Sequence, residues 1–189
     1  MPVRPITVVG HPALARRAKQ VRTVTPEIRV LVSDMFETNT AAHGAGLAAN
    51  QVGAQWSIFI VDCEDGAGQH VRAHVLNPRL EMGPMAPLDR DQDLEGCLSF
   101  PGEAFPRRRA TWARVRGIDL DGQEVVIEAE GGTLARCLQH EHDHLQGRLF
   151  VDNLDPEDRV AALAARRERG WERRHVRTWD PDTQRPEKV

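Results

Sequence analysis

The stretch that decides the fold is Thr133-Leu134-Ala135-Arg136-Cys137-Leu138-Gln139-His140-Glu141-His142-Asp143-His144-Leu145-Gln146, preceded by Gly131-Gly132 and followed by Gly147. We expect one helix over residues 133–146, because a glycine commonly follows the last residue of a helix. The stretch contains the pattern H-E-x-x-H. Residues four apart share one face of a helix, so His140 and His144 can bind one metal ion, with Glu141 beside them to reach a water molecule.

Two other interpretations of this pattern are a chance match and a surface cluster of histidines, and its position inside a helix argues against both. His142 adds a third histidine to the pattern. Residues two apart do not share a helix face, so we expect His142 to point away from the metal, with a role as an extra ligand as the alternative.

A catalytic metal site usually has three protein ligands and one open position, so a third ligand is needed. The extended metallopeptidase pattern would place a histidine where Phe150 stands. Cys97, between Gly96 and Leu98, is a candidate, and three downstream glutamates are weaker ones: Glu157, Glu168 and Glu172. From the residues alone, Cys97 is equally well explained as a metal ligand and as a small buried apolar residue. For Cys63 and Cys137 the interpretation as small buried apolar residues is favoured.

Patterns on either side predict the remaining elements. A helix should run from Thr25, its N-cap, through Pro26 to about Asn39, with one buried face. Strands are expected at residues 56–61 and 71–76, and residues 83–93 should form a loop. Residues 111–120 and 125–129 should form a hairpin around Asp121-Gly122.

A third helix should begin at Asp155-Pro156 and turn Val160, Leu163 and Ala164 inward. Strands outnumber helices in the middle of the chain. The predicted fold is therefore α+β, with mixed or antiparallel strands packed around the central metal-binding helix and with an N-terminal and a C-terminal helix.

The composition suits one domain with a sizeable core, because the chain has 189 residues, of which 40% are hydrophobic and 28% charged. A formal charge of -3 argues against a dedicated nucleic-acid binder. The three cysteines are an odd, sparse set that predicts a reducing compartment rather than a disulfide framework. The sequence has no apolar run resembling a signal peptide or a membrane span, so we expect a cytoplasmic protein with no membrane partner.

Three segments together resemble the signature of the peptide deformylase family: Gly44-Ala45-Gly46-Leu47-Ala48-Ala49-Asn50-Gln51, Glu95-Gly96-Cys97-Leu98-Ser99 and Gln139-His140-Glu141-His142-Asp143-His144-Leu145-Gln146-Gly147. Their order and separations also fit the family. The pattern H-E-x-x-H alone is moderately specific, whereas the three motifs together are highly specific. The resemblance implies hydrolysis of the N-formyl group of the N-terminal formyl-methionine of newly synthesised polypeptides, with release of formate.

The resemblance also implies the ligand set, which is Cys97, His140 and His144. It implies one Fe²⁺ ion per chain, which Ni²⁺, Co²⁺ or Zn²⁺ can replace. Thiolate and imidazole ligands suit several first-row metals, so the donors themselves do not select iron. The alternatives are another H-E-x-x-H metallopeptidase, a structural metal protein and a family member that has lost its activity.

Further roles follow from the same resemblance. Glu141 is expected to act as general base and then as acid, while the Gln51 side-chain amide and the Leu98 backbone N–H stabilise the oxyanion. The substrate-binding set is expected to comprise Gly46, Ala45 and Glu95, with Glu95 also orienting the ligands. Many members carry larger aliphatic residues in place of Ala45 and Arg136, which lie near the methionine pocket. The sequence therefore does not predict the shape of this pocket.

We expect a catalytic domain of residues 1–165 and a basic, polar tail of residues 166–189. This segment contains two tryptophans, Trp171 and Trp179. It also contains six arginines: Arg166, Arg167, Arg169, Arg173, Arg174 and Arg177. One interpretation is a solvated helix end with a disordered tail. The other is a docking element for the negatively charged RNA of the ribosome. On that view, truncation after Ala165 should leave activity on short formyl-Met peptides nearly intact.

Overall fold

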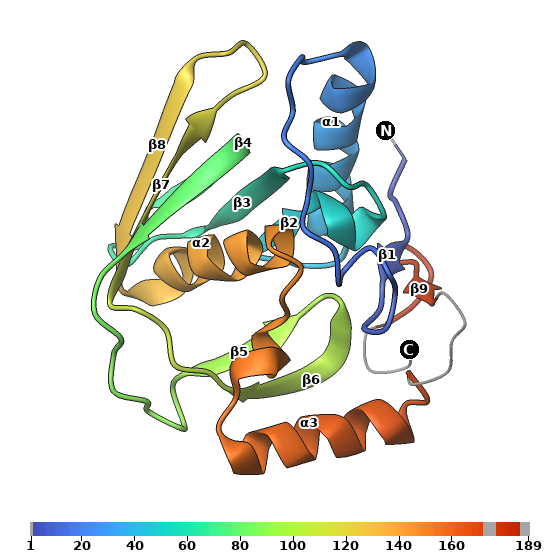
Figure 1. Cartoon of the computed structure of the whole chain (residues 1–189), viewed down its shortest axis with the longest axis vertical. Helices are drawn as coiled ribbons and strands as arrows, with labels where there is room; N and C mark the ends of the chain where they lie inside the picture. Colours follow the sequence, from blue (N-terminus) through green and yellow to red (C-terminus); the bar gives the residue numbers. More distant parts are fainter. Residues whose placement is uncertain (1, 172–176, 186–189) are drawn as a thin grey trace.

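A five-stranded antiparallel sheet and one helix crossing it form the centre of the molecule (Figure 1). The computed structural model describes residues 2–171 and 177–185. The strands lie in the order β2-β3-β4-β7-β8 and are, in that order, Gly46–Ala48, Ile58–Glu64, His70–Met82, Trp112–Ile118 and Glu124–Glu130. All four neighbouring pairs are antiparallel.

The described residues form three α-helices, of which the first two pack on this sheet. Helix α1 (Pro26–Ala41) packs beside β2 and β3, α2 (Gly132–Leu145) lies across the sheet, and α3 (Pro156–Glu168) runs along the opposite end of the molecule (Figure 1). Two 3₁₀ turns, η1 (Ala49–Val52) and η2 (Phe150–Asn153), follow β2 and α2.

Two small antiparallel sheets complete the fold. Strand β5 (Leu94–Cys97) pairs with β6 (Phe100–Pro106), and β1 (Ile6–Thr7) pairs with β9 (Thr178–Trp179). Figure 1 shows β1 and β9 side by side although they come from opposite ends of the chain. The register of β5 and β6 shifts between Gly96 and Cys97. Such irregularities occur often beside active sites, where they redirect a side chain.

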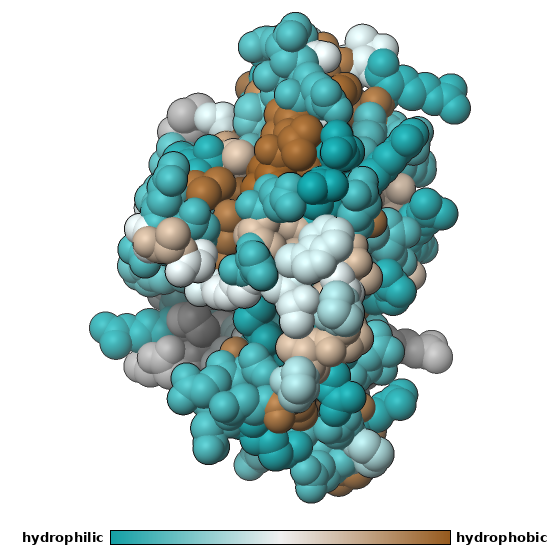
Figure 2. Space-filling view, turned by 90° about the vertical axis from the view of Figure 1, so that its left-hand side faces the viewer, coloured by the Kyte–Doolittle hydropathy of each residue, from teal (hydrophilic) through white to brown (hydrophobic). Residues whose placement is uncertain are grey.

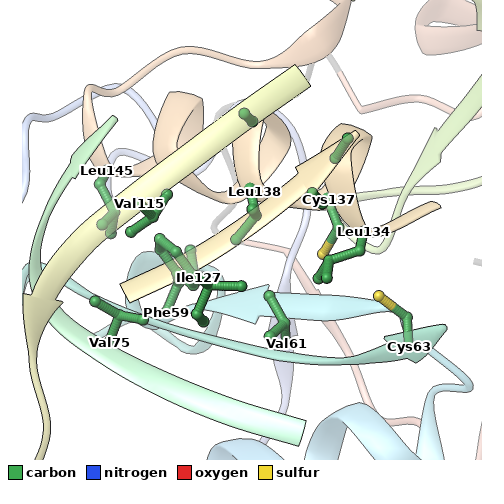
Figure 3. Close-up of a cluster of buried hydrophobic side chains, with 14 residues drawn as sticks. Phe59, Val61, Cys63, Val75, Val115, Ile127, Leu134, Cys137, Leu138 and Leu145 are labelled. Atoms are coloured by element: carbon green, nitrogen blue, oxygen red, sulfur yellow. The ribbon is translucent and has the colours of Figure 1, made fainter. Parts of the chain in front are cut away.

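The main core fills the space between α2 and the sheet. Leu134, Cys137 and Leu138 of α2 point toward Phe59 and Val61 of β3 (Figure 3). All five side chains are buried, and burial of large aliphatic and aromatic side chains of this kind contributes about 1.5–3 kcal/mol each. This packing fixes α2, and with it the H-E-x-x-H residues, relative to the sheet.

The predicted α+β class, the central helix and the hairpin of β7 and β8 are confirmed. The predicted inward face of α3 is wrong, because Val160 is 67% and Leu163 45% exposed. The helix instead buries Ala162 and Asp158, and Asp158 accepts a hydrogen bond from the Arg90 guanidinium at 2.8 Å. An ion pair and a small residue therefore set the rotation of α3, rather than its aliphatic residues.

The segment expected to form a tail is partly packed into the domain. The boundary placed after residue 165 falls inside α3, and Trp171 and Trp179 are each 1% exposed. Both belong to a second core cluster that includes Ile6, Phe100 and Phe150. Among the arginines singled out in this segment, Arg173 and Arg174 lie outside the described residues.

Figure 2 shows that hydrophilic residues cover most of the face on the left of Figure 1, while hydrophobic residues gather in its upper part. Charged side chains on neighbouring strands form exposed ion pairs, such as Arg114 of β7 with Glu128 of β8 at 2.8 Å. Within residues 2–171 and 177–185, no helix has the length and apolar character that crossing a bilayer requires.

Candidate active site

The three predicted metal ligands meet at one point. Cys97 ends β5, while His140 and His144 lie one turn apart on α2. Cys97 Sγ is 3.2 Å from His144 Nε2, which is 3.1 Å from His140 Nε2. One donor atom from each residue lies within 4.8 Å of the others, and among the described residues no other group of three His, Cys, Asp or Glu side chains does so. His142 is outside this cluster, with its Nε2 atom 3.5 Å from Gln146 Nε2.

Glu95 orients the His140 ring through a contact with its Nδ1 atom. Its Oε1 atom lies 2.8 Å from His140 Nδ1, and the Arg109 guanidinium donates to both carboxylate oxygens at 2.6 and 2.9 Å. Burial opposes ionisation of Glu95, but the hydrogen bonds from His140 and Arg109 hold the pKa of its carboxyl well below its usual range. Arg109 also donates to Asp143 at 2.6 Å, so one buried cation ties β5 to α2.

The geometry fits a divalent transition-metal ion. With Nδ1 of His140 hydrogen-bonded to a carboxylate, Nε2 keeps a free lone pair directed at Cys97 and His144. Burial and the neighbouring His140 lower the pKa of His144 well below its ordinary value, which favours the neutral imidazole that a metal requires. One sulfur and two nitrogen atoms that converge in this way form a donor set suited to several first-row metals.

Glu141 is a buried carboxylic acid at the same site. It is 3% exposed, and its Oε2 atom has no hydrogen-bond partner. Burial raises the pKa of Glu141 to about 7. A carboxyl group with a pKa near neutrality is suited to both accept and release a proton.

Gly46 makes room for this carboxylate. A Cβ atom at residue 46 would lie 2.6 Å from Cys137 Sγ and 3.0 Å from Glu141 Oε1. Any side chain at this position would therefore displace the wall of the site. Glycine fits here because it has no Cβ atom.

The Gln51 side chain faces the metal ligands in a fixed orientation. Its Oε1 atom accepts a hydrogen bond from the Ala48 backbone N–H at 2.8 Å. Its Nε2 atom is consequently turned toward Ser99 Oγ at 3.3 Å and Cys97 Sγ at 3.7 Å. The amide donors of Gln51 thus lie beside Cys97 and Ser99.

A cavity of about 750 Å³ opens onto these groups. Its walls include Ala45, Gly46, Leu98, Cys137 and Arg136, and its lining contains Gln51, Cys97, His140 and Glu141. Glu95, which was expected in the substrate-binding set, is not part of this lining and is 7% exposed. The guanidinium of Arg136 is hydrogen-bonded to Asp93, to Glu95 and to the backbone carbonyl of Arg107.

The sequence interpretation missed several supporting residues. Arg109 was not singled out from its arginine run, and Ser99 was quoted in a motif without a role. The Thr7 hydroxyl reaches the Gln51 carbonyl at 3.1 Å from more than forty positions away. No local pattern signals such a contact, because it depends on how distant segments pack. A buried carboxylate beside converging donors on an H-E-x-x-H helix defines the class, which is a metal-dependent hydrolase.

Comparison with known proteins agrees with this class. The family model described as Polypeptide deformylase matches residues 3–160. Peptide deformylase 2 of Corynebacterium efficiens is 41% identical over 184 residues, covering 96% of this chain and 94% of the relative. The peptide deformylase of Mycolicibacterium paratuberculosis is 46% identical over 163 residues, covering 82% of each chain.

Solved structures give the same result. The peptide deformylase from Ehrlichia chaffeensis in complex with actinonin has a TM-score of 0.79 at 34% identity, covering 92% of this chain and 99% of that one. The peptide deformylase from Thermus thermophilus has a TM-score of 0.74 at 36% identity, covering 88% of this chain and 94% of that one. The chain belongs to the polypeptide deformylase family. The predicted family and deformylase activity are thereby confirmed.

Proposed function

We propose that the chain hydrolyses the N-formyl group of the N-terminal formyl-methionine of newly synthesised polypeptides, using the residues gathered around Cys97. One observation carries this proposal: the donors of Cys97, His140 and His144 converge beside the buried carboxyl group of Glu141 at the wall of a cavity. Membership of the family supports the reaction. Because the proposed substrates are newly made polypeptides, we propose the cytoplasm as the location.

Cys97, His140 and His144 would hold one divalent cation. When bound, such a cation lowers the pKa of a water molecule toward neutrality and polarises a carbonyl oxygen. Glu95 and Arg109 keep the His140 ring in the required tautomer and orientation. We propose Fe²⁺ as the native ion, in line with the family resemblance, with Zn²⁺, Ni²⁺ and Co²⁺ as replacements.

Glu141 moves the proton. The carboxylate accepts a proton from the water whose oxygen attacks the formyl carbon. It then delivers that proton to the amine nitrogen as the carbon–nitrogen bond breaks, so that formate and a free amino terminus leave. The unpartnered Oε2 atom and the raised pKa of Glu141 support this dual role.

Gln51 and Leu98 stabilise the charge that develops on the formyl oxygen. The Ala48 N–H holds the Gln51 amide with its NH₂ group toward Cys97, so this donor needs no reorientation during the reaction. The backbone N–H of Leu98, directly after the ligand Cys97, is the second proposed donor. Fixed donors of this kind favour the transition state over the substrate.

The cavity walls near Ala45, Gly46 and Cys137 are proposed to receive the methionine side chain. Ala45 leaves more room than the larger aliphatic residue common in the family. The positive charge of Arg136 is compensated by Asp93 and Glu95. An apolar substrate side chain can therefore lie against the aliphatic part of Arg136 without contacting an unpaired cation.

The basic segment after residue 165 is proposed to dock on the ribosome. Arg167 is exposed on α3, and Arg169 of the same segment pairs with Glu103 at 2.9 Å. A local cluster of arginines can bind RNA phosphates even in a chain of negative net charge.

The decisive experiment measures formate released from formyl-Met-Ala-Ser by protein purified without oxygen, with metal analysis of the same sample. Formate release in proportion to bound metal is the expected result. A metal-loaded protein that cleaves internal peptide bonds and releases no formate would instead indicate another H-E-x-x-H metallopeptidase.

A further inference from the structure

The C-terminal strand reaches the active site. Backbone pairing joins Trp179 of β9 to Ile6 of β1, and the Val8 N–H donates to the Arg177 carbonyl at 2.9 Å. The Trp179 side chain is 1% exposed and forms part of the cavity lining together with Cys97 and Leu98. It is the one lining residue that the described chain supplies from beyond α2.

The indole of Trp179 makes a specific contact there. Its Nε1–H donates to the backbone carbonyl of Leu98 at 2.8 Å. The next residue is held as well, since the Ser99 N–H lies 3.4 Å from Cys97 Sγ and the Ser99 carbonyl accepts from the Val9 N–H at 2.8 Å. The turn that follows the metal ligand is therefore fixed on both sides of Leu98.

The same pair of strands also braces the other proposed oxyanion donor. The Thr7 hydroxyl of β1 lies 3.3 Å from the Asn50 carbonyl and 3.1 Å from the Gln51 carbonyl. Strand β1 thus links η1, which carries Gln51, to β9, which carries Trp179. Both donors are connected to one small sheet.

We propose that Trp179 is a positioning residue for deformylation: by holding the Leu98 carbonyl it fixes the backbone of Leu98, so that the Leu98 N–H, in the preceding peptide group, meets the formyl oxygen. This inference rests on the proposed oxyanion role of Leu98. Displacing a donor by a fraction of an ångström weakens a hydrogen bond that matters in the transition state more than in substrate binding. The expected effect therefore falls on kcat rather than on KM.

The matched pair Trp179→Phe and Trp171→Phe tests this role. Both tryptophans are 1% exposed, belong to the same core cluster and lie in the same C-terminal segment. Trp171 Nε1, however, has no hydrogen-bond partner. The two substitutions remove a similar volume, but only Trp179→Phe removes a bond to Leu98.

Each variant is purified anaerobically, and its metal content, melting temperature, kcat and KM on formyl-Met-Ala-Ser are measured with the wild type. Outright removal of an oxyanion donor lowers kcat about 10²–10³-fold, so we expect roughly a tenfold fall for Trp179→Phe. KM and metal content should match those of Trp171→Phe. The Leu98 amide resonance in ¹H–¹⁵N spectra should shift in Trp179→Phe alone.

Equal kcat values for the two variants would overturn the positioning role. The amide resonance then locates the error: an unchanged resonance means that Trp179 does not hold Leu98, whereas a shifted one means that the Leu98 N–H does not stabilise the oxyanion. A metal-loaded wild type that releases no formate would contradict the proposed function itself, separately from the role of Trp179.

Discussion

The side-chain amide of Asn50 donates a hydrogen bond to the backbone carbonyl of His144 at 2.6 Å. The two residues come from different motifs, and both are buried, at 0% and 1% exposure. The carbonyl belongs to the last turn of α2, where it also accepts a hydrogen bond from the Gly147 backbone N–H at 3.0 Å. Asn50 therefore joins η1 to the C-terminal end of α2.

Substituting Asn50 by alanine should destabilise the protein, because it removes a buried hydrogen bond between η1 and α2 and leaves the His144 carbonyl with the Gly147 N–H alone. The expected loss in the free energy of unfolding is about 0.5–1.5 kcal/mol, the net contribution of one hydrogen bond. Thermal unfolding of the metal-free protein measures it, with Asn153→Ala as the control at an exposed position. Equal melting temperatures for the two variants would show that the contact contributes no net stability.

Metal binding should depend on three residues and no other cysteine. Replacing Cys97, His140 or His144 by alanine should greatly reduce the bound metal, because a site with two ligands holds a divalent ion weakly. Cys63→Ala and Cys137→Ala should retain it, since neither sulfur belongs to the cluster. Metal analysis of the purified variants gives the result, and full occupancy in Cys97→Ala would remove this residue from the ligand set.

Glu141→Gln should separate catalysis from metal binding. Glutamine has nearly the same size but cannot accept the proton of the attacking water. We expect retained metal and a fall in turnover of about 10²–10⁴-fold or more. Formate release per bound metal ion is the measurement, and a metal-loaded variant with near-normal turnover would exclude Glu141 from the mechanism.

Air should inactivate the iron form. Oxygen oxidises Fe²⁺, and it can also oxidise the thiolate of Cys97, which is partly accessible. Replacement by nickel should protect the activity. The half-lives of the two metal forms in air, followed by formate release, check this expectation, and equal half-lives would contradict the assignment of iron.

Docking on the ribosome is best tested by changing charge rather than by truncation. Cutting the chain after Ala165 interrupts α3 and removes Trp171 and Trp179, so the earlier expectation of intact activity no longer holds. Three substitutions in the basic segment, Arg167→Gln, Arg173→Gln and Arg174→Gln, should instead reduce co-sedimentation with ribosomes at low salt and leave kcat unchanged.

The matched control for docking removes the same charge elsewhere, at three exposed positions: Arg16→Gln, Arg17→Gln and Arg22→Gln. Binding that depends on the segment should fall in the first variant only and should weaken in the wild type as salt is raised. Equal co-sedimentation of the two triple variants would rule out the segment as the docking element.

The sequence predicted the parts of the fold that local patterns determine. Helix α2 with its two histidines one turn apart and the hairpin of β7 and β8 follow from periodicity and turn residues. The pairing of β5 with β6 was missed, because residues 94–106 contain glycines and prolines in place of a regular alternation. Their strand geometry comes from pairing with each other and from packing against the rest of the domain.

Long-range contacts set the remaining features of the site. The carboxylate of Glu95 meets Arg109 and His140 only after β5 and α2 have packed together. Two tryptophans in a basic, polar segment gave no periodic signal, although both are core residues. Single aromatic residues in a charged context are therefore better indicators of packing than the average composition of their segment.

The pairing of β1 with β9 also sets an order for the enzyme's own maturation. Translation delivers His140, His144 and Glu141 before Trp179, so these residues are made before the strand that packs beside Leu98 exists. Strand β1, made first, must wait for β9 before this small sheet can form. The cavity consequently lacks its Trp179 wall until β9 has been made and has paired with β1.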